Sequence, residues 1–387
     1  MPRLTRPSLV LFLCLFVSQA AMLVLSPVLP DVARDLGIST ATAGQLRSLS
    51  GLTGGATAVL LALAPRRPGL RDLLTGGAAL VAAGSALSAA APSFALLAVA
   101  QGVAGIGIGV LVAVGIAAAG EWPPAAEERP RVLAWAIAGM PAAWIAGMPV
   151  VGAVANVSWR AAWLVPTVAA LTAVAVVRRR PSDRASSRAR GRPGAWRDPD
   201  VARFALGELL ANAAWASVLT YAGALLLESY DLTPAVVALG LGAMAAAMVP
   251  GTFLARRHAA RATPALLAAL TAFQAGAVVV LGGVRPAAAA TLAVLAGMAF
   301  VNGWRSMVAS VIGMDAAPQD RVAVMSMRAA ANQFGYLLGA AAGGLALALA
   351  GFAGLGIALG CLFAAAVLVH VPALLPSGPA VAPEGAS

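Results

Sequence analysis

The chain has 387 residues, of which 60% are hydrophobic and only 11% are charged, and its mean hydropathy is +0.87. Soluble domains carry about 25% charged residues, so this composition excludes an ordinary soluble protein and predicts an all-α membrane protein. The formal net charge of +11 comes from 26 arginines, with no lysine. Because these arginines lie mostly in short segments between apolar runs, where they set orientation in a membrane, we expect no nucleic-acid partner.

Apolar runs of about 20 residues, the length that a membrane-spanning helix needs, recur along the whole chain. We place them at residues 8–33, 41–64, 72–91, 93–119, 131–155, 160–177, 201–228, 235–255, 264–283, 287–313, 322–349 and 351–375. Residues 1–22 also have the features of a signal peptide, but the many further spans make a first transmembrane helix the simpler interpretation. The sequence therefore predicts twelve transmembrane helices.

A basic segment, residues 178–200, separates the sixth span from the seventh. It holds eight arginines and three aspartates, and a segment this polar cannot bury enough apolar surface to fold alone. We expect it to lie in the cytoplasm against anionic lipid headgroups. The predicted domains are two six-helix halves, 1–177 and 201–375, joined by this linker and followed by a disordered cytoplasmic tail, 376–387.

The distribution of arginines predicts how the chain sits in the membrane. Twenty arginines fall on the side of the N-terminus, whereas the loops of the other side receive only Arg34, Arg160 and Arg285. By the positive-inside rule, we expect a multi-pass protein of the cell membrane with both termini in the cytoplasm.

The two sets of spans also resemble each other. Residues 63–67, Leu-Ala-Pro-Arg-Arg, follow the second span, and residues 254–257, Leu-Ala-Arg-Arg, follow the eighth, 191 positions later. Asp35-Leu36 and Asp231-Leu232 precede the same two spans, 196 positions apart. Offsets near half the chain length indicate a duplicated unit, as in transporters built from parallel halves.

Three ionisable residues, Glu208, Arg305 and Arg328, fall inside predicted spans toward their cytoplasmic ends. Such residues cost roughly 2.5–3.5 kcal/mol on insertion scales and usually face a partner or a water-filled cavity. Two interpretations remain open: a polar cavity wall with Glu208 as a proton or cation site, or a gate network in which Glu208 pairs with an arginine or an arginine reaches the headgroups. Polar residues that share these stretches are Asn212, Asn302 and Asn332.

Three further polar residues are candidates for the substrate or coupling cavity. Arg47 lies about two turns from the outer end of the second span, Gln19 lies in the first span and Gln101 in the fourth. If Arg47 and the three ionisable residues all face the cavity, one negative and three positive charges favour an anionic or zwitterionic substrate.

Four motifs lie at the ends or within the spans. Residues 29–39 read Leu-Pro-Asp-Val-Ala-Arg-Asp-Leu-Gly-Ile-Ser, and residues 147–152 read Gly-Met-Pro-Val-Val-Gly, followed by Ser-Trp-Arg at 158–160. Asn-Gln-Phe-Gly at 332–335 and Gln-Gly at 101–102 complete the set. In these motifs the chain resembles the major facilitator superfamily, and within it the twelve-helix drug and sugar efflux branch, the drug:proton antiporter-1 and arabinose-efflux-like group.

This resemblance implies transport by alternating access, with Gly147, Pro149 and Gly152 as the conformational motif. A proline removes a backbone donor and favours a kink, and small residues let helices approach closely in lipid. The chain departs from the family pattern at Met22, Pro65 and Ala98, which stand where relatives carry charged residues tied to the family's mechanics or to proton coupling. Proton coupling therefore stays open.

The sequence bears on three classes of function. The favoured one is secondary active transport, with export of drugs or metabolites, and import or facilitated diffusion of a small organic anion is the alternative. A membrane enzyme needs a loop with clustered reactive side chains, which no loop offers, and a non-transporting sensor or scaffold normally adds a soluble domain. We expect a monomer that binds a small molecule and needs no metal or cofactor.

Overall fold

The computed structural model describes residues 6–63, 68–123, 125–180, 199–257, 262–316 and 321–370. These ranges are almost entirely helical, and no strand occurs within them. Pro65, most of the predicted linker and the whole predicted tail lie outside the described residues.

The helices before the linker follow the predicted spans, although several spans are interrupted. The first span is broken at Val24, the fifth contains a short π-helix, and the sixth begins with a separate turn. The elements are α1 (Arg6–Leu23), α2 (Leu25–Asp35), α3 (Thr40–Leu63), α4 (Leu70–Ala90), α5 (Phe94–Glu121), the 3₁₀-helix η1 (Ala126–Glu128), α6 (Arg129–Ala142), the π-helix η2 (Ala143–Gly147), α7 (Met148–Ala155), α8 (Trp159–Ala162) and α9 (Leu164–Arg178).

Five helices follow the linker in the described part of the chain. They are α10 (Pro199–Tyr230), α11 (Pro234–Arg257), α12 (Pro264–Gly283), α13 (Ala288–Ala316) and α14 (Arg321–His370). Helix α14 comprises two spans, because Ala350 and Gly351 leave the helical conformation and Gly351 has a φ of 62°. Glycine adopts this left-handed conformation without steric cost, so the chain turns at the joint that the sequence predicts.

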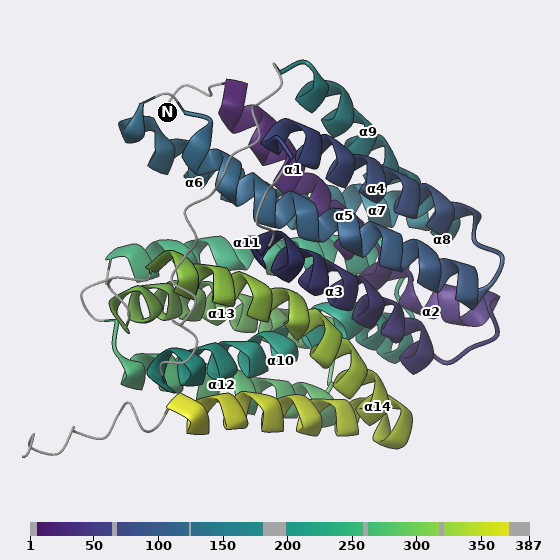
Figure 1. Cartoon of the computed structure of the whole chain (residues 1–387). Helices are drawn as coiled ribbons and strands as arrows, with labels where there is room; N and C mark the ends of the chain where they lie inside the picture. Colours follow the sequence, from purple (N-terminus) through teal and green to yellow (C-terminus); the bar gives the residue numbers. More distant parts are fainter. Residues whose placement is uncertain are drawn as a thin grey trace, which may run out of the picture.

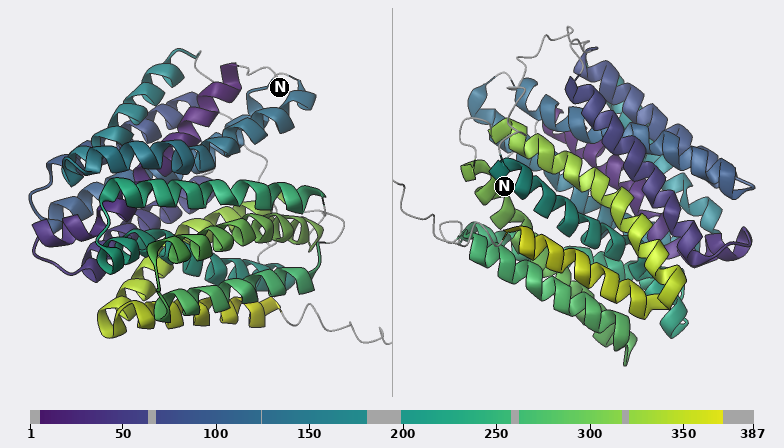
Figure 2. Two further views of the ribbon diagram at one scale, coloured as in Figure 1. Left: turned by 180° about the vertical axis from the view of Figure 1, so that it is seen from behind. Right: turned by 60° about the horizontal axis from the view of Figure 1, so that its bottom comes forward.

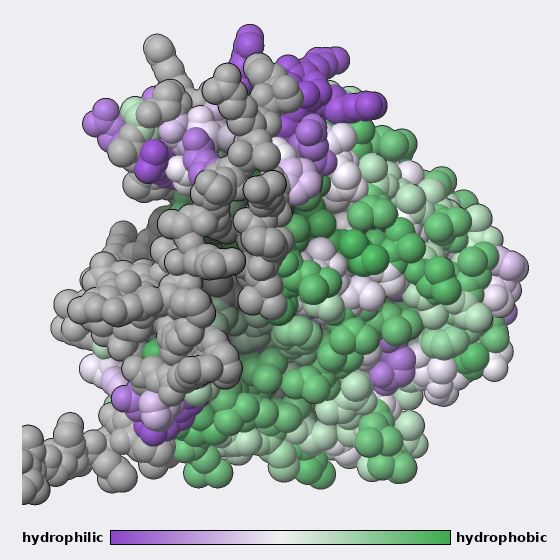
Figure 3. Space-filling view, in the orientation of Figure 1, coloured by the Kyte–Doolittle hydropathy of each residue, from purple (hydrophilic) through white to green (hydrophobic). Residues whose placement is uncertain are grey.

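Ten helical segments in the described part of the chain are long and apolar enough to cross a membrane. Ala330–His370 counts once among them although it bends at Gly351, and α3 is not among them. Counting the bent segment as two spans and adding α3 gives the predicted twelve. The face drawn in Figure 3 is largely apolar, and its hydrophilic residues gather mainly over the ends of α1, α6 and α9.

Helix packing repeats between the two parts of the chain. In the N-terminal half (α1–α9), α1 packs on α6, α3 on α5, and α4 on α9. In the C-terminal half (α10–α14), α10 packs on the first part of α14, α11 on α13, and α12 on the second part of α14. In span order these are pairs 1–5, 2–4 and 3–6, then 7–11, 8–10 and 9–12, so the fold is two pseudo-symmetric six-helix halves (Figure 1).

Glycines allow helix α5 to lie directly against two neighbours. A Cβ atom on Gly107 would sit 2.5 Å from the carbonyl oxygen of Gly77 on α4. A Cβ on Gly109 would collide with the carbonyl oxygen of Gly54 on α3. Lipid supplies no hydrophobic force to bring helices together, so such close backbone contacts carry much of the packing.

The two halves meet at one end of the molecule, the contact end, where the chain turns between α2 and α3, between α7 and α8, and between α10 and α11. Contacts between the halves join α3 to α14, α2 to α10, and α7 to α11. Toward the opposite end, which carries the arginines at the start of α6 and the end of α9, helices α6 and α11 diverge (Figures 1 and 2). We call this second end the arginine-rich end.

Replacing Gly109 by Ala should destabilise the N-terminal half, because overpacking a close contact costs about 1–3 kcal/mol. The matched control is Gly120→Ala on the same helix, where a Cβ meets no atom within 4 Å. That control should leave the unfolding temperature of the purified protein unchanged or raised, since Ala favours helix over Gly. Equal unfolding temperatures for the two variants would contradict the packing described here.

Candidate functional site

Glu208 is the centre of a buried ion-pair network in the C-terminal half. Its Oε1 accepts a hydrogen bond from Nη1 of Arg305 at 2.7 Å, and its Oε2 accepts one from Nε of Arg328, also at 2.7 Å. The carboxylate is 0% exposed and Arg305 is 1% exposed. One carboxylate from α10 thus joins α13 to α14 well inside the helix bundle.

Neighbouring polar groups hold the two guanidinium groups in place. Arg328 donates from Nη1 to the hydroxyl of Ser310 at 2.7 Å, and from Nη2 to the hydroxyl and carbonyl oxygens of Ser306 at 2.7 and 2.9 Å. Arg305 donates from Nε to Oδ1 of Asn302 at 3.5 Å, and Gln274 of α12 donates to the same oxygen at 3.4 Å. The network therefore connects all the helices of the C-terminal half except α11.

The charges of this network do not cancel, because two guanidinium groups share one carboxylate. Burying an ion pair costs several kcal/mol per ion before the mutual attraction is counted, and further hydrogen bonds are needed to offset that cost. The serine and asparagine contacts supply such bonds. Protonation of Glu208 would remove the negative charge that holds both arginines.

The remaining polar candidates near this network lie apart from it. Asn212 is half-buried and packs where a side chain on Gly335 would stand, and Asn332 is exposed. Within the described residues neither makes a hydrogen bond to Glu208, Arg305 or Arg328. The structure thus brings together four predicted residues, Glu208, Asn302, Arg305 and Arg328, and leaves these two asparagines outside.

In the N-terminal half, two predicted glutamines bond to neighbouring helices. Gln19 of α1 accepts a hydrogen bond from the indole of Trp144 at 3.2 Å, and Gln101 of α5 donates to the hydroxyl of Ser88 on α4 at 2.9 Å. Both are buried. Each contact joins two elements of one half.

Arg47 lies in the contact between the halves, on α3. It is 1% exposed, and none of its three guanidinium nitrogens has a hydrogen-bond partner among the described residues. Its Cζ lies 5.6 Å from the centroid of the Tyr336 ring of α14. Beside it, Tyr221 of α10 donates to the carbonyl oxygen of Ala340 at 2.9 Å.

The conformational motif lies where the fifth span crosses α11. Pro149 has no N–H to donate to the carbonyl of Ile145, and the π-helix η2 occupies this turn. A side chain on Gly152 would collide with Ala238 of α11, whereas one on Gly147 would meet Leu23 at an ordinary 3.5 Å. Of the three residues of the conformational motif, Gly152 is therefore the one that permits close contact between the halves.

Several residues of the network were not predicted. Ser306 and Ser310 lie four positions apart, so they share one face of α13, and Gln274 is an isolated amide in an apolar span. Serines are common in membrane helices, so Ser306 and Ser310 could not be singled out from the sequence. A glutamine in an apolar span is rarer, so Gln274 could have been identified as a candidate.

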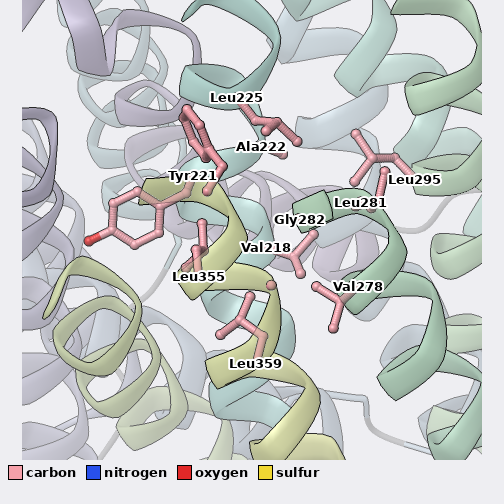
Figure 4. Close-up of a pocket in the computed structure, with 12 residues that line it drawn as sticks. Val218, Tyr221, Ala222, Leu225, Val278, Leu281, Gly282, Leu295, Leu355 and Leu359 are labelled. Atoms are coloured by element: carbon pink, nitrogen blue, oxygen red, sulfur yellow. The ribbon is translucent and has the colours of Figure 1, made fainter. Parts of the chain in front are cut away.

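A pocket in the C-terminal half does not coincide with any of these candidates. It lies among α10, α12, α13 and α14, and its lining is aliphatic and aromatic, including Val218, Leu281 and Leu295 (Figure 4). Tyr221 contributes its ring, but its hydroxyl points away from Leu281 and Leu295. The pocket offers no polar group that could orient a charged substrate.

Two pseudo-symmetric six-helix halves that touch at one end, with charges buried inside, define a polytopic membrane transporter. The sequence matches the family model described as Major Facilitator Superfamily over residues 11–319. The chain belongs to the Major Facilitator Superfamily.

Individual relatives agree with this assignment. A chloramphenicol resistance protein of Streptomyces lividans is 30% identical over 252 residues, which are 61% of this chain and 63% of that protein. The solved D-xylose–proton symporter has a TM-score of 0.75 at 15% identity, covering 94% of this chain and 96% of its own. A bacterial homologue of the human lysosomal transporter Spinster, solved in an inward-facing and unoccupied conformation, has a TM-score of 0.73 at 15% identity, covering 95% and 94%.

Replacing Glu208 by Gln should destabilise the protein by about 3–5 kcal/mol, because it leaves Arg305 buried without its anion. Thermal unfolding of the purified protein measures this as a lower midpoint. Glu228→Gln is the control, since Glu228 is exposed and bonds to Thr40, and its effect should be much smaller.

A double-mutant cycle with Arg328→Gln tests whether the two side chains act together. The double variant should lose less stability than the sum of the single variants. Additive losses, or a Glu208→Gln midpoint equal to that of Glu228→Gln, would contradict the paired network.

Proposed function

We propose that this protein is a secondary active transporter that exports small molecules by alternating access of its two halves. The observation that carries the proposal is the position of the hydrogen bonds between the halves. Among the described residues, they join Thr40 to Glu228, Gln45 to Ala340, Ser48 to Leu337 and Asn156 to Ala235. All four lie at the contact end or in the adjoining part of the spans, so separating them requires no change within either half.

The proposed orientation follows from the arginines. With the arginine-rich end in the cytoplasm, the contact end faces outward, and this structure is closed on the outside. The protein would then lie in the cell membrane with both termini in the cytoplasm. We further propose that it acts as a monomer, that residues 1–177 and 201–375 are its two moving domains, and that the basic segment 178–200 rests on anionic lipids.

Export is favoured over import by the chloramphenicol resistance relative, because resistance is most simply obtained by removing the drug from the cell. That match spans less than two thirds of either protein, so chloramphenicol is a starting compound for the test. Import of a small organic anion is the second candidate, and the observation that favours it is the unpaired charge of Arg47 between the halves.

Coupling is proposed to act through Glu208. A proton on this carboxylate would release Arg305 and Arg328 together, and Arg328 is the more accessible of the two. The positions of Met22 and Ala98, where relatives carry charges, provide no alternative group, since both are apolar.

The test is cellular accumulation of chloramphenicol and of acidic, zwitterionic and cationic antibiotics and dyes in a host without its main pumps. We expect several-fold lower accumulation of at least one compound in cells that contain the protein. A protonophore and Glu208→Gln should each abolish the difference, whereas Glu121→Gln, which changes an exposed carboxylate at the end of α5, should preserve it at equal membrane abundance.

Each other outcome removes one part of the proposal. Lower accumulation that persists with the protonophore and in Glu208→Gln would remove proton coupling at Glu208. Unchanged accumulation of every compound would remove drug export, and higher accumulation of acids alone would favour the import of organic anions.

A further inference from the structure

Arg47 carries a charge that no residue in the described part of the chain neutralises. A guanidinium stays protonated in proteins, and here the described residues offer no acceptor to any of its three buried nitrogens. The face of the Tyr336 ring, 5.6 Å away, offers only a partial negative charge. This differs from the C-terminal half, where Arg305 and Arg328 share the carboxylate of Glu208.

The hydrogen-bonding side chains described in this part of the contact are neutral, and their donors are already used. On α3, Gln45 donates to the carbonyl oxygen of Ala340, and Ser48 donates to that of Leu337. On α10, Tyr221 also donates to Ala340. These side chains join α3 and α10 to α14 by hydrogen bonds. None of them carries a negative charge that could neutralise the Arg47 guanidinium.

A second buried polar group without a partner lies along the same contact. Gln333 of α14 is 2% exposed, and within the described ranges neither polar atom of its amide has a hydrogen-bond partner. Its Nε2 lies 3.1 Å from the position of a Cβ on Gly54. Gly54 follows Arg47 by seven residues on one face of α3, so the two polar groups lie at levels about 10 Å apart along the helix.

We propose that Arg47 and Gln333 form a binding site for a small organic anion on the transport path. The carboxylate of the ligand binds the Arg47 guanidinium, and its apolar body lies against the Tyr336 ring. The Gln333 amide offers a second polar contact once the halves have separated, because α3 and α14 touch directly at Gly51 in this conformation. The site is exposed when the halves separate at the contact end. The inference thus rests on the proposed alternating access, and it adds the substrate class.

This site also gives a physical reason for closure to depend on the ligand. When the contact end closes without an anion, the Arg47 charge is buried unpaired, which is costly. When it closes over a bound carboxylate, the charge is paired and bidentate hydrogen bonds form. A ligand that interacts better with the closed state shifts the equilibrium toward it.

The experiment uses the full-length protein in nanodiscs of phosphatidylcholine, which contain no anionic lipid to occupy the site. Benzoate is the probe, benzamide is its neutral counterpart of equal size, and the thermal unfolding midpoint is followed against ligand concentration. Benzoate should raise the midpoint of the unmodified protein, and benzamide should not. Arg47→Gln should weaken the apparent affinity for benzoate by about tenfold or more.

Two further variants separate binding from stability. Arg34→Gln removes the same charge at the same end of the molecule from a side chain that is 77% exposed, and it should keep the benzoate response. Arg47→Lys keeps the charge without the planar fork, and its affinity should fall between those of the unmodified protein and Arg47→Gln. If Arg47→Gln does not fold, the Arg47→Lys variant and the comparison of benzoate with benzamide still test whether Arg47 binds the carboxylate.

Equal responses to benzoate and benzamide, or a benzoate affinity that Arg47→Gln leaves unchanged, would overturn the proposal and leave Arg47 as a contact to Tyr336 alone. Failure of the proposed export is a separate result. Benzoate binding through Arg47 without lower drug accumulation would support this site and contradict export. Drug export without a response to benzoate would support export and contradict this site.

Discussion

A charge inside a membrane protein must find an opposite charge, a set of hydrogen bonds or water, and this constraint organises the molecule. Glu208 meets it within the C-terminal half by accepting hydrogen bonds from Arg305 and Arg328. Arg47, between the halves, does not meet it in this conformation. Charges paired inside one half favour a body that moves as a unit, and an unpaired charge at the boundary favours a boundary that opens.

Glycines bring helix backbones together both inside the halves and between them. Inside each half, backbone-to-backbone contacts such as Gly109 on Gly54 and Gly282 on Gly356 leave no space between helices. Between the halves, backbones approach just as closely at Gly223 against Ser26 and at Gly51 against Leu337, and side-chain hydrogen bonds complete the contact. The two regions differ in where the buried charges are paired, and the four hydrogen bonds described between the halves can break without a change inside either half.

The architecture could be predicted from the sequence because the bilayer imposes a fixed length and apolarity on every span. Even the bend at Ala350–Gly351 was expected, since two spans could not otherwise fit there. Glu208, Arg305 and Arg328 could also be singled out from the sequence, because an ionisable side chain inside a membrane span costs free energy. Their partners could not be predicted, because the pairing of Glu208 depends on how α10, α13 and α14 are rotated about their axes. The asparagines show this limit: Asn302 joins the network, while Asn332, four residues from Arg328, is exposed.

The most direct test of alternating access measures two distances in one protein by pulsed electron paramagnetic resonance. One pair of spin labels, at the exposed residues Val157 and Ser229, spans the contact end, and the other, at the exposed Arg129 and Ala202, spans the arginine-rich end. On addition of a transported compound, a longer distance should appear for the first pair and a shorter one for the second. Distances that stay unchanged, or that change in the same direction at both ends, would contradict two halves that move about a central site.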